Sequence, residues 1–460
     1  MMNIQNRNEI NLKGKHVSVI GAARTGLAVS ELVSFLGGTV FLSDQKNLTE
    51  TAETAISKNP NITVEFNGHT EKVHDADLMV ISPGVPQDAD IILTAINKGL
   101  PVVTEIEFAS WFTEDPIVAV TGTNGKTTTS TLIHKILEKG GNNSIFAGNV
   151  GHPFSTALLD SLENPAENTV YVLEISSFQM EHILHFKPDF AVLLNLSPDH
   201  LDRYNSFEDY VDAKLNILKN LEQTDTVVFN FDDKQLADRI KTNAICVPFS
   251  LKHSDSTLFS LNETKIYDNA QDVLVYLNDI KLPGKHNLEN LMAASTVGSL
   301  FHVENNQIQK VLTSFKGVPH RIEHVRTVNG VEYYNDSKAT TVESVKVAIN
   351  SFPHNSIILI MGGLDKGADF SELTPIAEKS VKKVICFGRA KAKIFDSMFE
   401  KIHCIECDSL ESSVKIANEL AKSSDVVLLS PGCASFDMFN DFEHRGNTFK
   451  TIVSQLNLDK

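Results

Sequence analysis

The stretch formed by residues 117–139 constrains the fold more than any other part of the sequence. It begins with a short apolar, β-branched run at 117–120, continues through the loop TGTNGKT at 121–127, and ends in a helix-compatible segment. A strand, a glycine-containing loop and a helix in this order are typical of an α/β sheet that binds phosphate where the helix begins. We therefore predict a parallel sheet around this strand.

The residues of the loop fit the chemistry of phosphate binding. Gly122 and Gly125 allow backbone N–H groups to converge on phosphate oxygens, and the helix N-terminus adds about half a positive charge. Lys126 can reach the β- and γ-phosphates, and Thr127 is placed to bind Mg²⁺. The generic motif has a glycine where this chain has Val120, so the match is to a variant loop. A glycine-rich turn with a solvated lysine is the alternative.

Composition limits the number of domains and the class of partner. A chain of 460 residues exceeds what one core usually supports, so we expect two to four domains. A formal net charge of −17 argues against a general nucleic-acid binder. No run approaches the roughly 18 apolar residues that span a bilayer, and residues 1–15 lack a signal-like apolar core, so we expect a cytoplasmic protein without a membrane partner.

Cysteine usage is that of reduced thiols. The five cysteines are an odd number in a large chain, which fits free thiols better than a disulfide framework. Cys404 and Cys407 form a lone CxxC pair with no second pair of ligands nearby, so we do not expect a metal or redox role for them.

The first 107 residues begin as a dinucleotide-type βαβ unit. A strand at 15–20 runs into the turn GAARTG at 21–26, a helical pattern and a second strand at 39–43. Ala23 stands where the middle glycine of G-x-G-x-x-G would lie, and its methyl group crowds the approach of a pyrophosphate.

Two further features of this region lie at the carboxyl edge of the predicted sheet. Asp44 follows the second strand, where a ribose or a base edge would be read, and a strand at 76–81 ends in the loop Ser82-Pro83-Gly84. We predict a Rossmann-like domain for a nucleotide-bearing ligand over residues 1–107. A glycine turn that only packs a helix is the alternative.

From about residue 108 to 317 strands and helices alternate, and acidic residues follow two apolar strands. The strand at 169–173 ends at Glu174, and the strand at 190–196 is followed by Ser-Pro-Asp-His200-Leu-Asp. Ligands bind at the carboxyl ends of strands in open α/β sheets, and a carboxylate there can hold Mg²⁺. His200 could add a nitrogen ligand, although a lone histidine at a strand end is more often a turn residue.

Lys214 falls on the apolar face of a predicted helix. The other members of that face are Phe207, Tyr210, Val211, Leu215 and Leu218. A lysine in this position either snorkels to the surface or is buried, and a buried amine loses its proton more readily and becomes available to react. The pattern alone leaves both possibilities open.

Two asparagines begin the helix predicted before residue 300. Asn287 and Asn290 lie three residues apart in the stretch that leads into a small-residue helix at 291–300, so both amides can face one ligand. An N-cap role for Asn287 is the alternative.

Residues from about 318 onward form a third predicted α/β unit. Three strands, at 331–334, 356–361 and 425–429, lead into loops at 335–341, 362–367 and 430–436. Each loop carries charged or hydroxyl side chains, and in a parallel sheet these junctions meet at one edge.

Together these motifs resemble the Mur ligase family. The resemblance runs in order along essentially the whole chain, at residues 21–26, 121–127, 148–151, 174–179, 199–202, Lys214, 286–290, 319–321, 335–340, 362–367 and 430–436. It implies an α/β protein of three domains: a Rossmann-like N-terminal domain at 1–107, a central P-loop ATPase-type domain with a parallel sheet at 108–317, and a C-terminal Rossmann-like domain at 318–460.

The resemblance also implies an activity. The expected reaction is the ATP-dependent addition of D-glutamate to UDP-N-acetylmuramoyl-L-alanine through an acyl phosphate, a step of peptidoglycan precursor synthesis. The implied cofactors are ATP and Mg²⁺, with two magnesium sites, and a carbamylated lysine that requires CO₂. The expected partners are these small molecules, and we expect a monomer.

Carried over residue by residue, the resemblance implies four sets of site residues. ATP would be bound by Gly122, Thr123, Asn124, Gly125, Lys126, Thr127, Thr128, Asn287, Asn290, Arg321 and Asp336. Metal ligands would be Thr127, Glu174, His200 and carbamylated Lys214. The UDP-linked substrate would be bound by Thr25, Asp44, Ser82, Gly84, Asn149 and Gln179, and D-glutamate by Lys338, Thr340, Lys366, Ser435 and Phe436. Lys126, His200 and Lys214 would be catalytic, with His200 and Asp336 both open as the general base. Two departures from the family pattern are Ala23, in place of a common glycine, and Thr341, where asparagine is frequent.

Other functions compete with this hypothesis. The nearest is a related amide ligase, either a family member that adds another amino acid or a folylpolyglutamate synthase. Members that add diaminopimelate or lysine lack a Rossmann-like first domain, and the L-alanine-adding member differs at residues 335–340. A nucleotide-driven switch would leave the charged loops of the C-terminal part without a role, and a binding protein would not need Lys126, Glu174 and His200.

Overall fold

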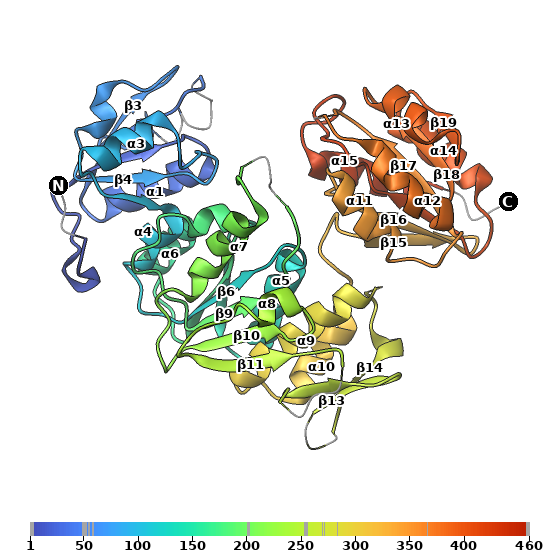
Figure 1. The fold of residues 1–460 in the computed structure, drawn as a ribbon, viewed down its shortest axis with the longest axis horizontal. Coiled ribbons are helices and arrows are strands. Elements are labelled where there is room, and N and C mark those ends of the chain that lie inside the picture. Colours follow the sequence, from blue (N-terminus) through green and yellow to red (C-terminus); the bar gives the residue numbers. More distant parts are fainter. Residues whose placement is uncertain are drawn as a thin grey trace. The chain divides into compact units, whose positions relative to one another are not determined.

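The computed structural model describes residues 4–47, 53, 56–57, 59–199, 203–252, 256–268, 270, 272–282, 284–365 and 367–456. The chain divides into two compact units, Met1–Leu277 with Leu288–Leu312 and Asn278–Asn287 with Thr313–Lys460. Three mainly parallel sheets with helices around them carry the fold (Figure 1), which confirms the expected α/β class. Within the described ranges, no helix combines the length and apolar character needed to cross a membrane.

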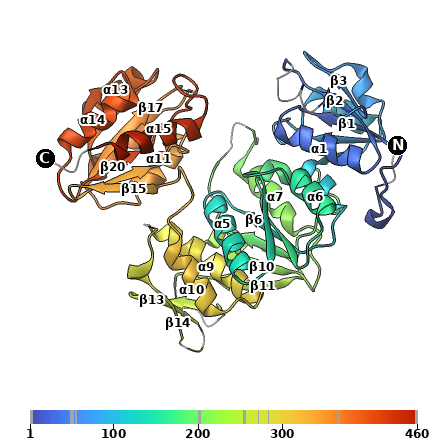
Figure 2. The same cartoon turned by 180° about the vertical axis from the view of Figure 1, so that it is seen from behind.

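The first sheet has five parallel strands in the order β3-β2-β1-β4-β5. The strands are β1 His16–Ile20, β2 Thr39–Ser43, β3 Ile62–Glu65, β4 Leu78–Ile81 and β5 Val102–Thr104, with helices α1 Arg24–Phe35 and α3 Asp90–Asn97. Figure 2 shows α1 lying against the first sheet. Val17 and Val19 pack into the core on the α1 side, while Ile20 joins a second core with α3. Because β1 lies between β2 and β4, the loops that follow β1 and β4 diverge and leave a crevice at the carboxyl edge.

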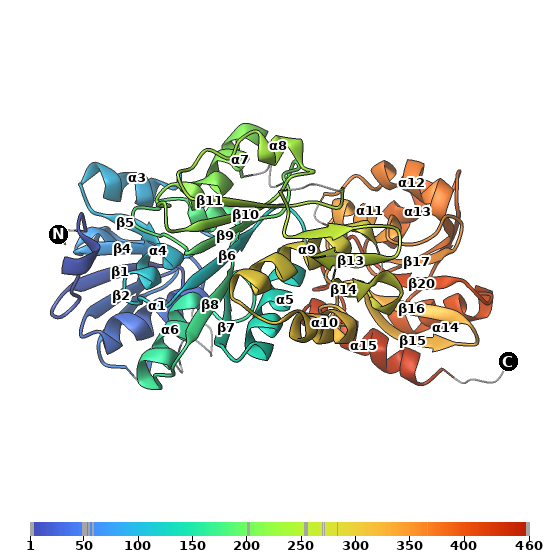
Figure 3. The ribbon, with the colours of Figure 1, turned by 90° about the horizontal axis from the view of Figure 1, so that it is seen from below.

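The second sheet has six parallel strands in the order β11-β10-β9-β6-β8-β7 (Figure 3). The strands are β6 Ile117–Thr121, β7 Asn143–Gly148, β8 Thr169–Glu174, β9 Phe190–Leu193, β10 Thr226–Asn230 and β11 Ile245–Phe249. Its helices include α4 Glu105–Ser110, α5 Lys126–Lys139, α6 Phe154–Glu163, α7 Phe207–Leu215 and α8 Lys234–Ala237. All five residues of β6 are buried, as expected for a strand covered on both faces.

Several boundaries in this region differ from the sequence prediction. The strand predicted at 190–196 ends at Leu193, because the next residues leave the ladder to follow the phosphate loop: Thr123 N–H donates to the Asn195 carbonyl. The predicted helix face reached Leu218, but α7 ends at Leu215 and a 3₁₀ turn, η4 Asn216–Leu218, follows.

A small antiparallel sheet follows β11, in a polar part of the chain for which we predicted no strands. It has the order β12-β13-β14, with β12 Phe259–Leu261, β13 Lys265–Asp268 and β14 Val273–Tyr276. Only a few apolar side chains, among them Phe259, Ile266 and Val275, are buried, so the alternation was too short to stand out. The helices that follow are α9 Lys285–Leu300 and α10 Asn305–Ser314. Since α9 begins at Lys285, the N-cap alternative for Asn287 is wrong.

The third sheet, in the second unit, has the order β15-β16-β20-β17-β18-β19. Its strands are β15 Glu323–Val328, β16 Val331–Asn335, β17 Ile357–Gly362, β18 Val381–Phe387, β19 His403–Glu406 and β20 Val426–Leu429; only β15 is antiparallel to its neighbour. Figure 3 shows α11 Val342–Ile349, α12 Thr374–Ser380 and α13 Lys391–Met398 on one side, and α14 Leu410–Leu420 and α15 Phe442–Ser454 on the other. A separate apolar core fills each side.

One buried carboxylate joins α4 to the segment before β9. Glu107 is fully buried, and its two oxygens accept backbone N–H groups from Leu184 (3.1 Å), His185 (2.7 Å) and Phe186 (2.7 Å). It also accepts the indole N–H of Trp111 at 2.7 Å. A single side chain therefore satisfies four donors that have left water.

We expect Glu107→Ala to lower the free energy of unfolding of the first unit by at least about 3 kcal/mol, because buried donors without a partner each cost roughly 1–3 kcal/mol. Urea unfolding monitored by the fluorescence of Trp111, the only tryptophan in the chain, measures this change.

Glu9→Ala, which alters an exposed carboxylate, is the control. Equal stability of Glu107→Ala and the wild-type protein would contradict the argument.

Candidate functional site

The phosphate loop folds as its glycines predict. Gly122 (φ 151°) and Gly125 (φ 85°) have backbone conformations that side chains disfavour, and Gly125 caps the N-terminus of α5. A Cβ atom on Gly122 would lie 2.9 Å from Cβ of Leu194, and one on Gly125 would lie 2.3 Å from Oδ1 of Asn290. Neighbouring elements therefore approach the loop so closely that only glycine fits at these positions.

An asparagine that the sequence did not single out fastens the tip of this loop. Asn195 Oδ1 accepts the backbone N–H of Asn124 at 2.8 Å, and Asn195 Nδ2 donates to the Asn124 carbonyl at 3.1 Å. Asn290 lies beneath the same loop, where its Oδ1 accepts the Thr129 hydroxyl at 3.1 Å and its side chain is 3% exposed. The predicted ATP-binding residue Asn290 thus lies against the loop, and Asn195 adds a second support.

Two lysines converge on one carbonyl oxygen of the loop. Lys126 Nζ donates to the Gly122 carbonyl at 2.9 Å and to the Thr123 carbonyl at 2.8 Å. Lys214 Nζ, from α7, donates to the same Gly122 carbonyl, also at 2.9 Å. The predicted catalytic lysines therefore lie side by side at the start of α5.

Lys214 is buried, which excludes the snorkelling alternative. Its side chain is 2% exposed, and Nζ lies 4.7 Å from the centre of the Tyr210 ring. Burial lowers the pKa of Lys214 well below its usual value, and the Lys126 ammonium lowers it further, while Asp199 and Glu174 act in the opposite direction. The amine is thus shifted toward the neutral, reactive form.

Two buried oxygens beside the loop fit a divalent cation. Thr127 Oγ1 and Glu174 Oε2 are both buried and have no hydrogen-bond partner among the described residues. Glu174 ends β8, where it pairs with Val120 just before the loop, and its other oxygen, Oε1, accepts Asn149 Nδ2 at 3.1 Å. Buried polar atoms normally have partners, and hydroxyl and carboxylate oxygens are ligands that Mg²⁺ prefers.

The remaining predicted metal ligand cannot be placed. His200 lies outside the described residues, so its role as ligand or base stays a prediction. No cluster of three or more His, Cys, Asp or Glu side chains suited to a metal ion occurs in the part of the chain that the structure describes. A cation at Thr127 and Glu174 would therefore need further ligands, such as phosphate oxygens.

All five cysteines are free thiols.

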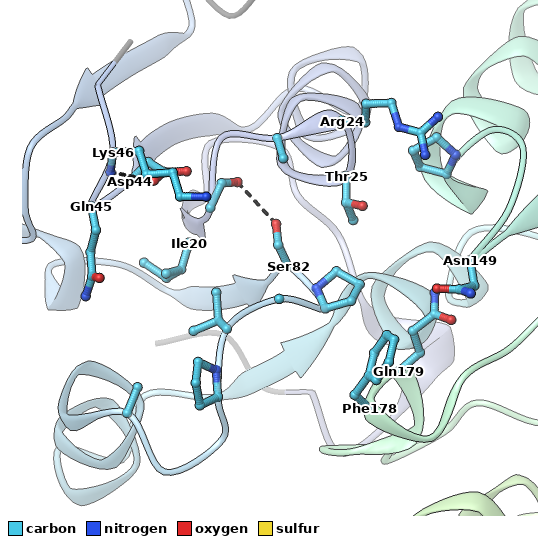
Figure 4. A pocket seen from close by; sticks show the side chains of 18 of the residues that line it. Ile20, Arg24, Thr25, Asp44, Gln45, Lys46, Ser82, Asn149, Phe178 and Gln179 are labelled. Atoms are coloured by element: carbon cyan, nitrogen blue, oxygen red, sulfur yellow. Dashed lines mark hydrogen bonds between the residues drawn. The ribbon is translucent and has the colours of Figure 1, made fainter. Parts of the chain in front are cut away.

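A cavity of about 740 Å³ lies in the first unit between the loops of the first sheet and those of the second (Figure 4). All six residues predicted for the UDP-linked substrate line it: Thr25, Asp44, Ser82, Gly84, Asn149 and Gln179. Ala23, which replaces the middle glycine of the turn, lines it as well. The structure thus brings together side chains that lie up to 154 positions apart, from Thr25 to Gln179.

Asp44 and Ser82 shape the mouth of this cavity. Asp44 accepts the backbone N–H groups of Ala22 (2.6 Å) and Lys46 (2.8 Å), so its carboxylate closes the glycine turn as well as lining the cavity. Ser82 Oγ donates to the Gly21 carbonyl at 3.1 Å and joins the loops after β1 and β4 (Figure 4).

Basic and aromatic residues that the sequence did not single out also line the cavity. They are Arg24, Lys46, His69, Phe178 and Arg203. Lys46 lies two positions after Asp44, so its place near the carboxyl end of β2 could have identified it as a lining residue. Arg203 follows residues 200–202, which lie outside the described residues, and its only signal in the sequence was that it comes directly after the Asp-His-Leu-Asp motif.

Arg203 connects the two halves of the cavity wall. Its guanidinium donates to the carbonyls of Pro83 (3.1 Å) and Val85 (3.2 Å), in the loop after β4. On its other side it pairs with the buried Glu181 at 2.7 Å. Its Cζ atom lies 5.3 Å from the centre of the Phe178 ring. One side chain thus fixes the first-sheet loop against the second-sheet turn that carries Gln179.

The second unit contains the residues predicted for D-glutamate and for part of ATP. Lys338 and Thr340 follow β16 and Ser435 follows β20, so all three lie at the carboxyl edge of the third sheet. Lys338 Nζ lies 4.9 Å from the centre of the Phe442 ring, a residue that sequence reasoning missed. Phe436 is 67% exposed. Lys366 lies outside the described residues, so its role stays a prediction.

Asp336 is buried in the same unit. Burial raises the pKa of its carboxyl to about 7, although hydrogen bonds from Ser430 Oγ (2.8 Å) and the Ile322 N–H (3.2 Å) favour the ionised form. The nearby Arg321 has a buried Nε without a hydrogen-bond partner among the described residues. Asp336 can therefore exchange a proton near neutral pH, and Arg321 has a donor available for a ligand.

Three family models match the chain in series. They are the MurD N-terminal domain at residues 21–91, the Mur ligase middle domain at 120–298, and the Mur ligase, glutamate ligase domain at 320–433. A protein of Salinibacter ruber named UDP-N-acetylmuramoylalanine--D-glutamate ligase is 40% identical over 454 residues, which cover 95% of this chain and 97% of the other. The chain belongs to the Mur ligase family. Proteins of the same name from Koribacter versatilis and Clostridioides difficile are each 39% identical over 97% of this chain and over 99% and 100% of theirs.

Solved structures of other Mur ligases share the fold. UDP-N-acetylmuramate-alanine ligase MurC from Thermotoga maritima has a TM-score of 0.61 at 20% identity, covering 96% of this chain and 99% of that one. MurF from the same organism, in complex with ADP, has a TM-score of 0.60 at 19% identity, covering 98% and 97%. Mur ligases are ATP-dependent amide ligases, and the family implies ATP and Mg²⁺ as cofactors.

We expect Arg203→Lys to weaken the binding of uridine diphosphate to this Mur ligase by about tenfold, because lysine keeps the charge but cannot bridge Glu181 and two carbonyls at once. Titration calorimetry with uridine diphosphate measures the affinity.

Arg239→Lys is the matched control, since Arg239 pairs with the exposed Glu208 away from the cavity. Unchanged affinity in a folded Arg203→Lys protein would show that Arg203 does not support the cavity.

Proposed function

We propose that this Mur ligase adds D-glutamate to UDP-N-acetylmuramoyl-L-alanine at the expense of ATP, in the synthesis of peptidoglycan precursors. Relatives named for this reaction align over nearly the whole chain at 39–40% identity. The observation in the structure that carries the proposal is the convergence of Lys126 and Lys214 on the Gly122 carbonyl. Buried oxygens of Thr127 and Glu174, which have no hydrogen-bond partner among the described residues, add to it. Such a site is suited to transferring a phosphoryl group rather than only to holding a nucleotide.

Each part of the chain would take one ligand. Residues 1–107 would bind the UDP moiety in the 740 Å³ cavity, with Asn149 and Gln179 facing the substrate from the second sheet. Residues 108–317 would bind ATP through Gly122 to Thr128, Asn287 and Asn290. Residues 318–460 would bind D-glutamate through Lys338, Thr340, Lys366, Ser435 and Phe436, and would add Arg321 and Asp336 to the nucleotide. The expected cytoplasmic location and monomeric state stay predictions.

The reaction would proceed in two steps. The substrate carboxylate attacks the γ-phosphorus of ATP, which gives an acyl phosphate and ADP. The amine of D-glutamate then attacks the acyl carbon, and the C–O bond to phosphate breaks as the amide forms. The protein takes little part in the covalent chemistry, so it would accelerate these steps mainly by positioning the substrates and neutralising their charge.

The chain's own residues would divide this work. The ammonium of Lys126 would move from the loop carbonyls to the γ-phosphate, where charge accumulates. Thr127 and Glu174, with His200, would hold Mg²⁺, which neutralises phosphate charge when bound. The attacking amine must lose protons, and Asp336, with its pKa near 7, and His200 are the two candidates for the base.

Lys214 would act as a carbamate. The ammonium would first lose one proton. The neutral amine would then attack the carbon of CO₂, forming an N–C bond as one C=O π bond opens onto oxygen, and would release a second proton. The resulting carbamate anion would be able to ligate a second Mg²⁺. Burial, the lowered pKa and the nearby Lys126 cation support this, because they disfavour the ammonium and favour an anion in its place.

We expect Lys214→Ala to lose activity by about a hundredfold or more, since a lost preorganised electrostatic contact costs at least that much. Formate or acetate should restore part of the activity by replacing the carbamate. Wild-type activity should fall when bicarbonate is rigorously depleted, and mass spectrometry should find the added CO₂ on Lys214.

Lys219→Ala is the control, because Lys219 lies five positions later and donates to the Ile183 carbonyl outside the loop. A wild-type enzyme that is indifferent to CO₂ and has unmodified Lys214 would remove the carbamate from the mechanism.

The function itself is tested by incubating the protein with ATP, Mg²⁺ and UDP-N-acetylmuramoyl-L-alanine and with each of D-glutamate, L-glutamate, diaminopimelate and L-lysine. We expect a product of the D-glutamate mass alone, because Lys338 and Lys366 offer cationic partners to its two carboxylates. ADP release should require the UDP-linked acceptor.

Equal product from both enantiomers, or product from a diamino acid only, would overturn the assignment. ADP release without the acceptor would favour a nucleotide-driven switch.

A further inference from the structure

We propose that Arg445 is a positioning residue of the D-glutamate pocket. Its buried guanidinium binds the three loops that follow β16, β17 and β20 and keeps their relative positions. The proposal rests on the proposed function, since it concerns how the pocket for the incoming amino acid is kept in shape. Arg445 lies on α15 and is fully buried, the largest side chain of the described residues with so little exposure. No motif in the sequence selects Arg445, because an isolated arginine in a helix usually faces solvent.

The guanidinium of Arg445 binds all three loops at once. Toward the loop after β16, Nε donates to Ser337 Oγ at 3.0 Å and Nη2 to the Ser337 carbonyl at 2.8 Å. Toward the end of β17, Nη1 donates to the Gly362 carbonyl at 3.3 Å. Toward the loop after β20, Nη1 donates to the carbonyls of Cys433 (3.1 Å) and Ala434 (3.4 Å). The bonded residues directly precede Lys338 and Ser435, which are predicted to contact D-glutamate.

None of these acceptors carries a charge. All five bonds go to carbonyl or hydroxyl oxygens, although a buried arginine is normally expected beside a carboxylate. A planar fork with several fixed donors can satisfy backbone groups from separate loops, which a lysine or an apolar side chain cannot. Burial lowers the pKa of Arg445 to about 10, while the nearby carboxylates of Asp437 and Asp336 act in the opposite direction. Because its hydrogen bonds go to oxygens of the three loops and not to these acids, the arrangement indicates that Arg445 also holds the loops together.

The loops approach one another around this guanidinium. The Leu364 N–H donates to the Ala434 carbonyl at 2.8 Å, and the Ala434 N–H donates back to Leu364 at 3.1 Å. A Cβ atom on Gly363 (φ 137°) would lie 2.2 Å from the Ala434 carbonyl oxygen and 3.0 Å from Arg445 Nη1. The space a side chain would need at residue 363 is thus taken by the neighbouring loop and by Arg445.

The first turn of α15 carries a second connection to the pocket. Ser337 Oγ, which accepts from Arg445, donates to the Phe442 carbonyl at 2.8 Å. The Phe442 ring lies 4.9 Å from Lys338 Nζ. Arg445 and Phe442 therefore reach the same loop from one helical turn, and movement of Arg445 would displace the amine that is predicted to meet a substrate carboxylate.

The test is steady-state kinetics of Arg445→Lys and Arg445→Met in the full-length enzyme, with D-glutamate, ATP and the UDP-linked acceptor each varied in turn. We expect kcat/KM for D-glutamate to fall by about a hundredfold in both variants, because a displacement of about 1 Å in a positioning group can cost that much. The KM for the acceptor should stay within about twofold of the wild-type value, since its proposed cavity lies in the first unit. The KM for ATP should rise less than that for D-glutamate, since only Arg321 and Asp336 of the second unit are proposed to contact the nucleotide. Guanidinium ion at millimolar concentration should restore part of the D-glutamate activity of Arg445→Gly.

Arg326→Met is the matched control. Arg326 also lies in the second unit and donates to the Ser454 carbonyl at the far end of α15, at 2.7 Å, so it tests whether loosening that helix is sufficient. We expect Arg326→Met to keep the wild-type KM for D-glutamate.

The outcomes separate this proposal from the proposed function. Wild-type protein that ligates no D-glutamate would overturn the function itself. Active wild-type protein with an unchanged KM for D-glutamate in Arg445→Lys, or an equal rise of all three KM values, would overturn the positioning role alone. If circular dichroism shows that Arg445→Met and Arg445→Lys both fail to fold, Arg445 serves stability only, and the proposal also fails.

Discussion

The carbonyl oxygen of Gly122 accepts the amines of both Lys126 and Lys214, and the chemistry proposed for the central sheet depends on this convergence. Two ammonium groups at one buried carbonyl repel each other more strongly than they would in water, because the surrounding dielectric is lower. The repulsion falls when an anion binds at the loop or when one lysine gives up its charge. Lys214 is the more buried of the two, and burial lowers its pKa well below the usual value. A bound phosphate or a neutral Lys214 would therefore relieve the repulsion at the loop.

In each of the three mainly parallel sheets, a glycine lets two loops approach closely at the carboxyl edge. The glycine follows or ends a central strand, and a neighbouring loop occupies the space that a side chain at that position would need. A Cβ atom would lie 2.9 Å from Ser82 Cβ at Gly21, 2.9 Å from Leu194 Cβ at Gly122, and 2.2 Å from the Ala434 carbonyl oxygen at Gly363. Adjacent loops can therefore lie edge to edge at the carboxyl ends of the strands, where ligands of open α/β sheets bind.

Much of the fold and of the candidate site could be predicted, because in those parts the residues that determine the structure stand in short, recognisable motifs. The helix after the phosphate loop ends at Lys139 as predicted, and all six residues expected around the UDP-linked substrate line one cavity. Asn195, Arg203 and Arg445 were missed, because each acts on backbone groups of segments distant in sequence, and such contacts leave no periodic or motif signal. The small sheet β12-β13-β14 was missed for a different reason, since its strands of three or four residues are too short to show alternation.

Arginine and lysine have different tasks in this protein, and their side-chain chemistry accounts for the division. Arg203 joins two carbonyls of one loop to the Glu181 carboxylate, and Arg445 binds carbonyls from separate loops. The rigid fork of arginine stays charged when buried, so both residues suit fixed supports. Lys126, Lys214 and Lys338 each present one amine on a flexible stem, which can move to a ligand or, if desolvated, lose its proton. A support whose charge changed with its surroundings would let the loops shift during turnover, whereas the carbamate proposed for Lys214 needs an amine that can give up its charge. The positions of the two residue types therefore distinguish the parts of the site that must stay still from those that must respond to the substrate.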